Sequence, residues 1–301
     1  MISASFFLFS GSGGKETHCT SDWIDGFSKL AAEYDAKYER TVLQLEREIS
    51  KRKDFVGADW VEDDDEDEDE DSGSDDDEQQ RQSADAVGTS SGDRSRSVRL
   101  LDYACGTGLI SRALAQYTTQ CVGIDISENM VAAYNARAEN QGLSPSEMQA
   151  HQGDLTDPST PHPEAFTGPE FHNFDVAGVG LGFHHFHDPE FAAKRLVDRL
   201  RPGGVLIILD FLPHGAMDGA LPAADTVKHH GFSEERVRRM FEEAGAGEGF
   251  AMEELGAGVV FGHSHSHGHG GHGHGEGHDH GGKNGHAMKR RVFLARGTKK
   301  V

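Results

Sequence analysis

The residues best suited to chemistry lie in a short glycine-rich segment after an apolar run. Residues 98–101 read VRLL, Asp102 follows, and Gly106 and Gly108 form a turn before a helix predicted over residues 109–116. Glycines in such a loop let the backbone approach a ligand closely, and the exposed N–H groups at the start of the helix can donate hydrogen bonds to it. The strand–loop–helix pattern therefore predicts a binding site for a nucleotide-type ligand.

A second acidic residue follows the loop at a distance that suits a nucleoside. Residues 121–125 read CVGID, a short strand that ends in Asp125 about twenty residues beyond the loop. In a parallel sheet, a carboxylate at the tip of the neighbouring strand can accept hydrogen bonds from both ribose hydroxyls. We therefore expect Asp125 to bind a ribose.

Two families of nucleotide-binding proteins use such a loop, and one position separates them. The dinucleotide fingerprint G-x-G-x-x-G has a third glycine for helix packing, but Ser111 stands at that position. Residues 102–108, DYACGTG, instead resemble motif I of the class I S-adenosylmethionine-dependent methyltransferases. Ala104 departs from the motif, because the family usually has its first glycine there. A nicotinamide-dependent enzyme is the less favoured interpretation.

Two further segments resemble the same family, in the same order along the chain. Residues 152–155, QGDL, resemble the motif in which an acid binds the adenine amino group and an apolar neighbour flanks the ring. Residues 200–206, LRPGGVL, resemble the signature that precedes a central strand of the family. The resemblance implies S-adenosylmethionine as cofactor, with these binding residues: Asp102, Ala104, Cys105, Gly106, Thr107, Gly108, Asp125, Ile126, Asp154 and Leu155.

The resemblance covers residues 98–301 apart from one insertion, and it implies both a fold and an activity. The implied fold is α/β: a Rossmann-like, seven-stranded, mostly parallel sheet with an antiparallel last strand and helices on both faces. The implied activity is transfer of a methyl group to O, N or C of a small-molecule acceptor, as in the similar ubiquinone and menaquinone biosynthesis group. Residues 180–183, GLGF, lack the N/D-P-P-Y/F tetrapeptide of amino-methylating enzymes, so a protein or nucleic-acid acceptor is not expected.

Histidines follow the fourth predicted strand, residues 174–182, at the edge where a substrate would enter. Ligands of open parallel sheets lie at the carboxyl ends of the strands, and His184, His185 and His187 fall there. If the acceptor must lose a proton, His185 or His184 is the candidate catalytic base, and Asp210 is a weaker one. Such a histidine pair also occurs in related sequences without a catalytic role, so both alternatives stay open.

The remaining elements are predicted from capping residues and apolar patterns. Residues 205–211, VLIILDF, are apolar throughout, except for one aspartate, as in a central strand buried on both faces. Residues 257–261 and 291–296 are expected to form an antiparallel hairpin at one edge of the sheet. Three helices are expected, each between a residue that caps its start and a residue that ends it: Ser127 to Gly142, Asp188 to Pro202, and Ser233 to Gly245. In the second helix, Leu200 is expected to lie on the apolar face.

Residues 21–56 form the next predicted unit, a helical segment before the domain. Apolar residues recur in it every three or four positions, which predicts one apolar stripe along a helix. The segment either packs on the side of the domain or, as the resemblance implies, folds over cofactor and substrate as a lid. In the second case Tyr34, Asp35 and Tyr38 would line the pocket.

Two other segments are predicted to be disordered, residues 1–20 and an acidic linker, residues 57–97. Fourteen acidic residues between positions 62 and 78 supply most of the formal net charge of −22. Like charges at this density repel each other and bury no apolar surface. The rest of the chain is only mildly acidic and has no dense basic face, so general nucleic-acid binding is not expected.

A histidine-rich insertion, residues 263–287, interrupts the predicted domain between its last two strands. Nine of the nineteen histidines lie in it, separated mostly by glycine, which predicts a disordered loop. Imidazoles at this density bind transition metals adventitiously, but glycine spacing fixes no coordination geometry, so no dedicated metal site is predicted. An alternative function is nevertheless a non-catalytic cofactor-binding protein whose histidine-rich loop binds a transition metal.

The location of the protein is inferred from cysteines and apolar stretches. Three cysteines without a disulfide-type spacing favour a reducing compartment, either the cytoplasm or, as an alternative, the nucleus. The apolar run near the N-terminus has no basic residues before it and is too short to cross a bilayer. No membrane span is therefore expected.

Overall fold

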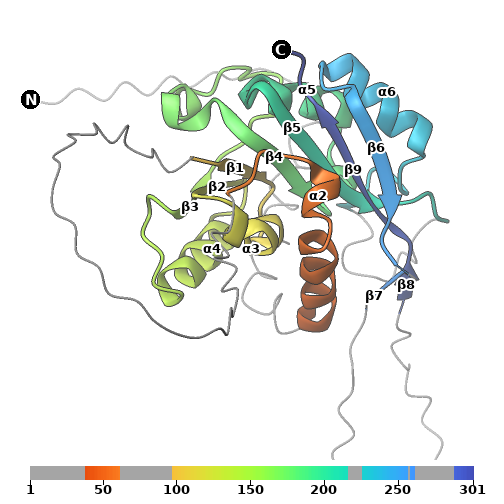
Figure 1. Cartoon of the computed structure of the whole chain (residues 1–301), viewed down its shortest axis with the longest axis horizontal. Helices are drawn as coiled ribbons and strands as arrows, with labels where there is room; N and C mark the ends of the chain where they lie inside the picture. The colour runs from red at the N-terminus through yellow and green to blue at the C-terminus, as the bar shows by residue number, and fades with distance from the viewer. Residues whose placement is uncertain (1–37, 62–96, 216–225, 257, 262–287) are drawn as a thin grey trace, which may run out of the picture.

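A seven-stranded sheet organises the computed structural model, which describes residues 38–61, 97–215, 226–256, 258–261 and 288–301. The strand order is β3-β2-β1-β4-β5-β9-β6; the first five of these are parallel, and β9 is antiparallel to both of its neighbours. This arrangement confirms the predicted fold (Figure 1). The strands are β1 (Arg99–Tyr103), β2 (Gln120–Asp125), β3 (Met148–Gln152), β4 (Phe174–Gly180), β5 (Leu200–Phe211), β6 (Glu248–Glu254) and β9 (Val292–Thr298).

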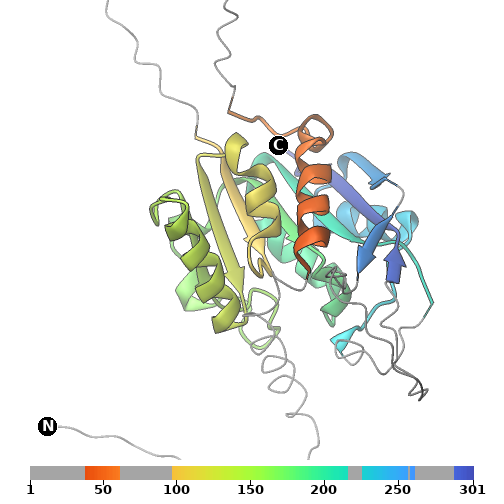
Figure 2. The ribbon, with the colours of Figure 1, turned by 90° about the horizontal axis from the view of Figure 1, so that it is seen from below.

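Helices cover both faces of the sheet, each over its own apolar cluster. One face carries a helix over residues 38–50 together with α2 (Lys53–Val56), α3 (Leu109–Leu114) and α4 (Glu128–Asn140). The opposite face carries α5 (Pro189–Arg199) and α6 (Glu234–Ala244). Figure 2 shows the first of these layers in front of the strands. The core is thus split by a sheet that is buried on both sides.

The predicted helix starts are confirmed by their caps. The side chains of Ser127, Asp188 and Ser233 each accept a hydrogen bond from a backbone N–H of the first turn of α4, α5 and α6 respectively. The prediction that Leu200 belongs to the apolar face of α5 was wrong. Leu200 has an extended backbone and is the first residue of β5, because it pairs with Phe174 of β4.

The predicted pairing of the last two strands was also wrong. Residues 292–298 form β9, but their edge partner is β6, which had no strand signal because its residues are mostly exposed and carry little alternation. Residues 259–261 instead form β7 (Val259–Phe261), which pairs antiparallel with β8 (Met288–Arg290) in a separate two-stranded ribbon. The histidine-rich insertion starts and ends at this ribbon, and the insertion itself lies outside the described residues.

The segment before the domain packs against α3. Leu45, Ile49 and Val56 are buried in the same cluster as the apolar residues of α3. Ser50 Oγ donates a hydrogen bond of 2.6 Å to the carbonyl of Ala113, and Glu46 forms an ion pair of 2.6 Å with Arg112. Residues 38–56 therefore pack on the side of the domain. The predicted lid contribution of Tyr34 and Asp35, the N-terminal segment 1–20 and the greater part of the acidic linker lie outside the described residues.

Candidate active site

The glycine loop joins β1 to α3 through residues in the left-handed backbone conformation. Ala104, Gly106 and Gly108 have φ angles of 52°, 51° and 95°. This conformation is costly for a residue with a Cβ atom, which accounts for the glycine that the family usually has at position 104. An added Cβ at Gly108 would lie 3.1 Å from the Tyr134 ring, whereas one at Gly106 would meet no described atom within 4 Å. Gly106 thus faces space in which a ligand can lie.

Asp125 ends β2 and holds the loop through both carboxylate oxygens. Oδ2 accepts a hydrogen bond of 2.9 Å from Gly106 N, and Oδ1 accepts one of 2.9 Å from Ser127 N. The side chain is largely buried, which raises the pKa of the carboxyl group, while these two backbone donors act against the rise. Each carboxylate oxygen has two acceptor positions, and the described residues fill one on each oxygen, which leaves the other for a diol. This geometry fits the two hydroxyls of a ribose.

Asp102 has a different environment, inside the core. Its Oδ2 accepts hydrogen bonds from Ser111 N at 3.0 Å and Ser111 Oγ at 2.9 Å, and the hydroxyl of Tyr134 donates to Ser111 Oγ. The side chain is 1% exposed, and burial raises the pKa of its carboxyl group to about 7. Asp102 thus anchors the first turn of α3 to β1 and supports the loop from within the core.

The other loop residues predicted to bind the cofactor differ in exposure. Ala104, Gly106 and Ile126 keep exposed surface, whereas Cys105 and Thr107 are buried. Burial raises the pKa of the Cys105 thiol well above its ordinary value. A cofactor would therefore contact Cys105 and Thr107 through their backbone groups.

Asp154 lies beside Asp125 because of the register between β2 and β3. Asp125 is opposite Gln152, and Gly153 N donates a hydrogen bond of 2.9 Å to the Asp125 carbonyl. Asp154 is half-buried, whereas the side chain of its neighbour Leu155 is fully buried in the core. The predicted residues Asp125 and Asp154 are thus brought to the same edge, next to the loop.

Tyr103 is a residue of this region that sequence reasoning did not single out. Its hydroxyl donates a hydrogen bond of 2.8 Å to Asp154 Oδ1 and accepts one of 3.2 Å from Leu155 N. In the sequence Tyr103 is one more large residue of an apolar strand, and its contact with Asp154 spans 51 positions. No local pattern could have revealed it.

The histidine pair follows β4 in a short 3-10 helix, η4 (Phe183–His185), and its members differ in their partners. His184 Nδ1 lies 2.9 Å from Oδ1 of Asp210, a fully buried aspartate near the end of β5. His185 Nδ1 donates to the carbonyl of Thr226 at 3.0 Å, and burial, aided by the neighbouring His184, lowers the pKa of His185 to about 3. His187 is exposed. The structure thus makes Asp210 the partner of His184, since its full burial removes it from contact with an acceptor.

Comparisons with known proteins agree with this geometry. A family model described as a methyltransferase domain matches residues 101–208, which include the glycine loop, Asp125 and Asp154. Over residues 101–208 the chain is therefore similar to methyltransferase domains. Its sequence is 31% identical to an uncharacterized methyltransferase of Schizosaccharomyces pombe over 50% of this chain and 54% of the relative. It is 32% identical to the demethylmenaquinone methyltransferase of Thermus thermophilus over 38% of this chain and 48% of the relative.

The matched part of the chain spans about half the length of these two curated relatives. A solved structure also shares its fold: the candidate methyltransferase in complex with the Trm112 methyltransferase activator of Haloferax volcanii. That chain is 14% identical, with a TM-score of 0.54 over 91% of this chain and 98% of the other. At this identity the likeness concerns the fold.

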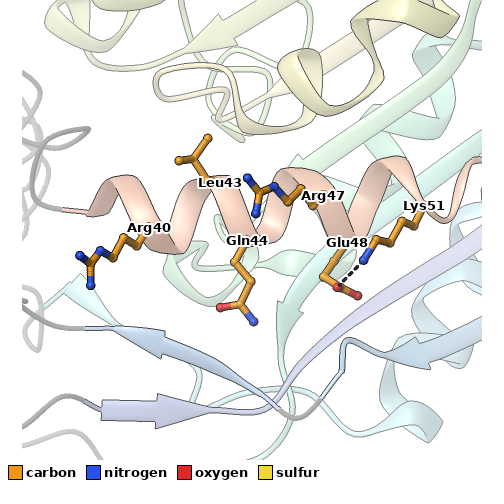
Figure 3. A pocket seen from close by; sticks show the side chains of 6 residues that line it. All are labelled: Arg40, Leu43, Gln44, Arg47, Glu48 and Lys51. Carbon is orange, nitrogen blue, oxygen red and sulfur yellow. Dashed lines mark ion pairs between the residues drawn. The ribbon is translucent and has the colours of Figure 1, made fainter.

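A hollow of about 370 Å³ lies along the helix over residues 38–50, away from the residues described above (Figure 3). It is lined by Arg40, Leu43, Gln44, Arg47, Glu48 and Lys51. Because none of the predicted cofactor residues lines this hollow, it is not the predicted cofactor site.

The described ranges hold neither a cluster of metal ligands nor a membrane-spanning helix. Within them, no group of three or more histidine, cysteine, aspartate or glutamate side chains is arranged to hold a metal ion. The histidine-rich insertion lies outside these ranges. No helix that the structure describes combines the length and apolar character needed to cross a bilayer.

Proposed function

We propose that this chain is an S-adenosylmethionine-dependent methyltransferase that acts on a small-molecule acceptor. The proposal rests mainly on the hydrogen bond from Gly106 N to Asp125, beside space above the loop that no described atom fills. A ribose diol bound by Asp125 would place the tail of the cofactor over Gly106. The match of residues 101–208 to a methyltransferase domain supports the same proposal.

The cofactor would supply a methyl group already activated by a sulfonium. The protein therefore mainly aligns the acceptor with the methyl carbon and excludes water. Asp125 and Asp154 would hold the nucleoside, and the backbone of the glycine loop would bind its tail. The half-buried ring of Phe211 lies 5.0 Å from the His184 ring, and half-buried Phe186 directly follows the histidine pair in the chain, which supports an acceptor with a flat apolar group.

A proton on the acceptor would need a base, and His184 is better suited to this role than His185. The pKa of His185, lowered to about 3, makes it a weak base. In His184, Asp210 holds Nδ1 and so leaves Nε2 as the proton acceptor, with the resulting positive charge stabilised by the carboxylate. Of the two histidines predicted from the sequence, His184 would thus act as the base, and His185 would stay neutral.

Calorimetric titration with S-adenosylhomocysteine and with NAD tests the proposal. We expect the protein to bind S-adenosylhomocysteine and not NAD. Asp125→Ala should weaken that binding by about 2–3 kcal/mol, the value of hydrogen bonds to a charged group. Asp157→Ala, at an aspartate after β3 whose carboxylate accepts hydrogen bonds from Ser159, serves as the matched control. Equal affinity of the wild-type protein and Asp125→Ala would remove the ribose assignment.

Deletion of residues 262–287 separates the proposal from the metal-binding alternative. Nothing in the part of the chain that the structure describes supports that alternative. We expect the deletion to leave binding of S-adenosylhomocysteine and methyl transfer unchanged. Tight, stoichiometric zinc binding that disappears with the deletion, in a protein without transferase activity, would favour the alternative instead. We also propose that the protein acts in the cytoplasm.

A further inference from the structure

Asp154 has an asymmetric set of hydrogen bonds. Three donors lie within hydrogen-bonding distance of its Oδ1 and share the acceptor positions of that oxygen: the Tyr103 hydroxyl at 2.8 Å, Thr156 N at 2.7 Å and Thr156 Oγ1 at 2.7 Å. Within the described part of the chain, no hydrogen bond reaches Oδ2. Since Oδ1 is saturated, a ligand can use only Oδ2, and the three donors fix the direction in which that oxygen points.

The hydroxyl of Tyr103 is suited to this task because it is buried. The Tyr103 side chain is 4% exposed, and its ring packs against Phe186 with a centroid separation of 5.7 Å. Burial, together with the charge of Asp154, raises the pKa of the phenol well above its ordinary value, so the hydroxyl keeps its proton. The same oxygen accepts a hydrogen bond from Leu155 N, and the hydroxyl itself is closer to Asp154 Oδ1, at 2.8 Å, than to the second acceptor, Thr156 Oγ1, at 3.3 Å. A fixed, neutral donor thus holds one side of the carboxylate.

We propose that Tyr103 is a positioning residue that sets the selectivity of the cofactor site for a 6-aminopurine. This inference rests on the proposed function, which assigns the nucleoside to this edge of the sheet. A carboxylate can only accept hydrogen bonds, so a fixed Oδ2 binds the amino group of adenine and repels the carbonyl oxygen of hypoxanthine. A carboxylate free to rotate discriminates less, because it can turn away from that carbonyl.

The test compares S-adenosylhomocysteine with S-inosylhomocysteine, which carries an oxygen in place of the amino group. We expect the wild-type protein to bind the adenosyl compound more tightly. Tyr103→Phe should lower the ratio of the two affinities about tenfold, as expected for loss of one hydrogen bond to a charged group, mainly by weakening the adenosyl compound. Thr156→Val, which removes another of the three donors, should lower the ratio in the same direction. Asp154→Asn should abolish the preference.

Tyr117→Phe is the matched control. Tyr117 is also buried, but on the opposite face of the sheet, where its ring packs against Trp60. This variant should keep the wild-type ratio. Thermal unfolding of each variant checks the fold, and Thr156→Val carries the test if Tyr103→Phe does not fold.

The outcomes separate this inference from the proposed function. An unchanged ratio in a folded Tyr103→Phe variant, or an equal loss of affinity for both compounds, would overturn the positioning role and leave the proposed function intact. A wild-type protein that binds both compounds equally would overturn the selectivity itself. A wild-type protein that binds neither compound would refute the proposed function, and this inference with it.

Discussion

Replacement of Asp102 by asparagine should change how the stability of the protein depends on pH. The carboxyl group is buried, and its pKa is raised from 3.8 to about 7 by that burial, against the hydrogen bonds from Ser111. The folded state therefore keeps a proton that the unfolded state releases between about pH 4 and pH 7. The contribution of Asp102 to stability is greatest when it is protonated, falls as the pH rises through this window and is constant above it.

The magnitude follows from the two pKa values. With 3.8 in the unfolded chain and about 7 in the folded one, linkage gives a loss of about 2.5 kcal/mol between pH 5 and pH 8. An asparagine side chain has nearly the same shape as the aspartate and does not titrate, so Asp102→Asn removes this loss. The difference between the free energies of unfolding of wild type and variant should thus fall by this amount over the same interval.

Urea unfolding followed by circular dichroism at pH 5, 6, 7 and 8 measures this difference. The second variant, Ser111→Ala, keeps the acid and removes a hydroxyl that lowers its pKa. It should move the pH at which stability becomes constant upward. Parallel profiles of wild type and Asp102→Asn would refute the reasoning, because they would mean that Asp102 titrates near its ordinary value and is reached by water.

Two further predictions concern the loop and the histidine pair. Ala104→Gly should stabilise the protein by about 0.5–1 kcal/mol, since relief of the left-handed backbone outweighs the entropy of glycine; a lower urea midpoint would contradict this. Asp210→Asn should lower turnover about 100-fold with an acceptor that loses a proton, because His184 loses the charge that supports its protonated form. The affinity of this variant for S-adenosylhomocysteine should stay within about twofold of the wild-type value. An equal loss of turnover and of affinity would instead indicate that Asp210 has a structural role.

The local features of this protein could be predicted from its sequence. The strand–loop–helix unit follows from an apolar run and glycines, and the starts of α4, α5 and α6 follow from capping residues, since both depend on neighbours in the chain. The mostly parallel sheet with its antiparallel last strand followed from the family resemblance, as did the expected position of Asp154, whereas Asp125 was expected from its place at the end of a short strand. Where such local signals were weak, the prediction failed: β6 has an exposed edge without clear alternation, and Leu200 fits a helix stripe as well as a strand.

The tertiary structure decided which side chains meet. Tyr103 reaches Asp154 because β1, β2 and β3 are adjacent and in register, and His184 reaches Asp210 because β4 and β5 end at the same edge. These contacts join residues 51 and 26 positions apart. Composition and spacing carry no information on such pairs. The register of the sheet determines which side chains meet, and burial determines how far the pKa of each group is shifted, and both depend on residues far apart in the sequence.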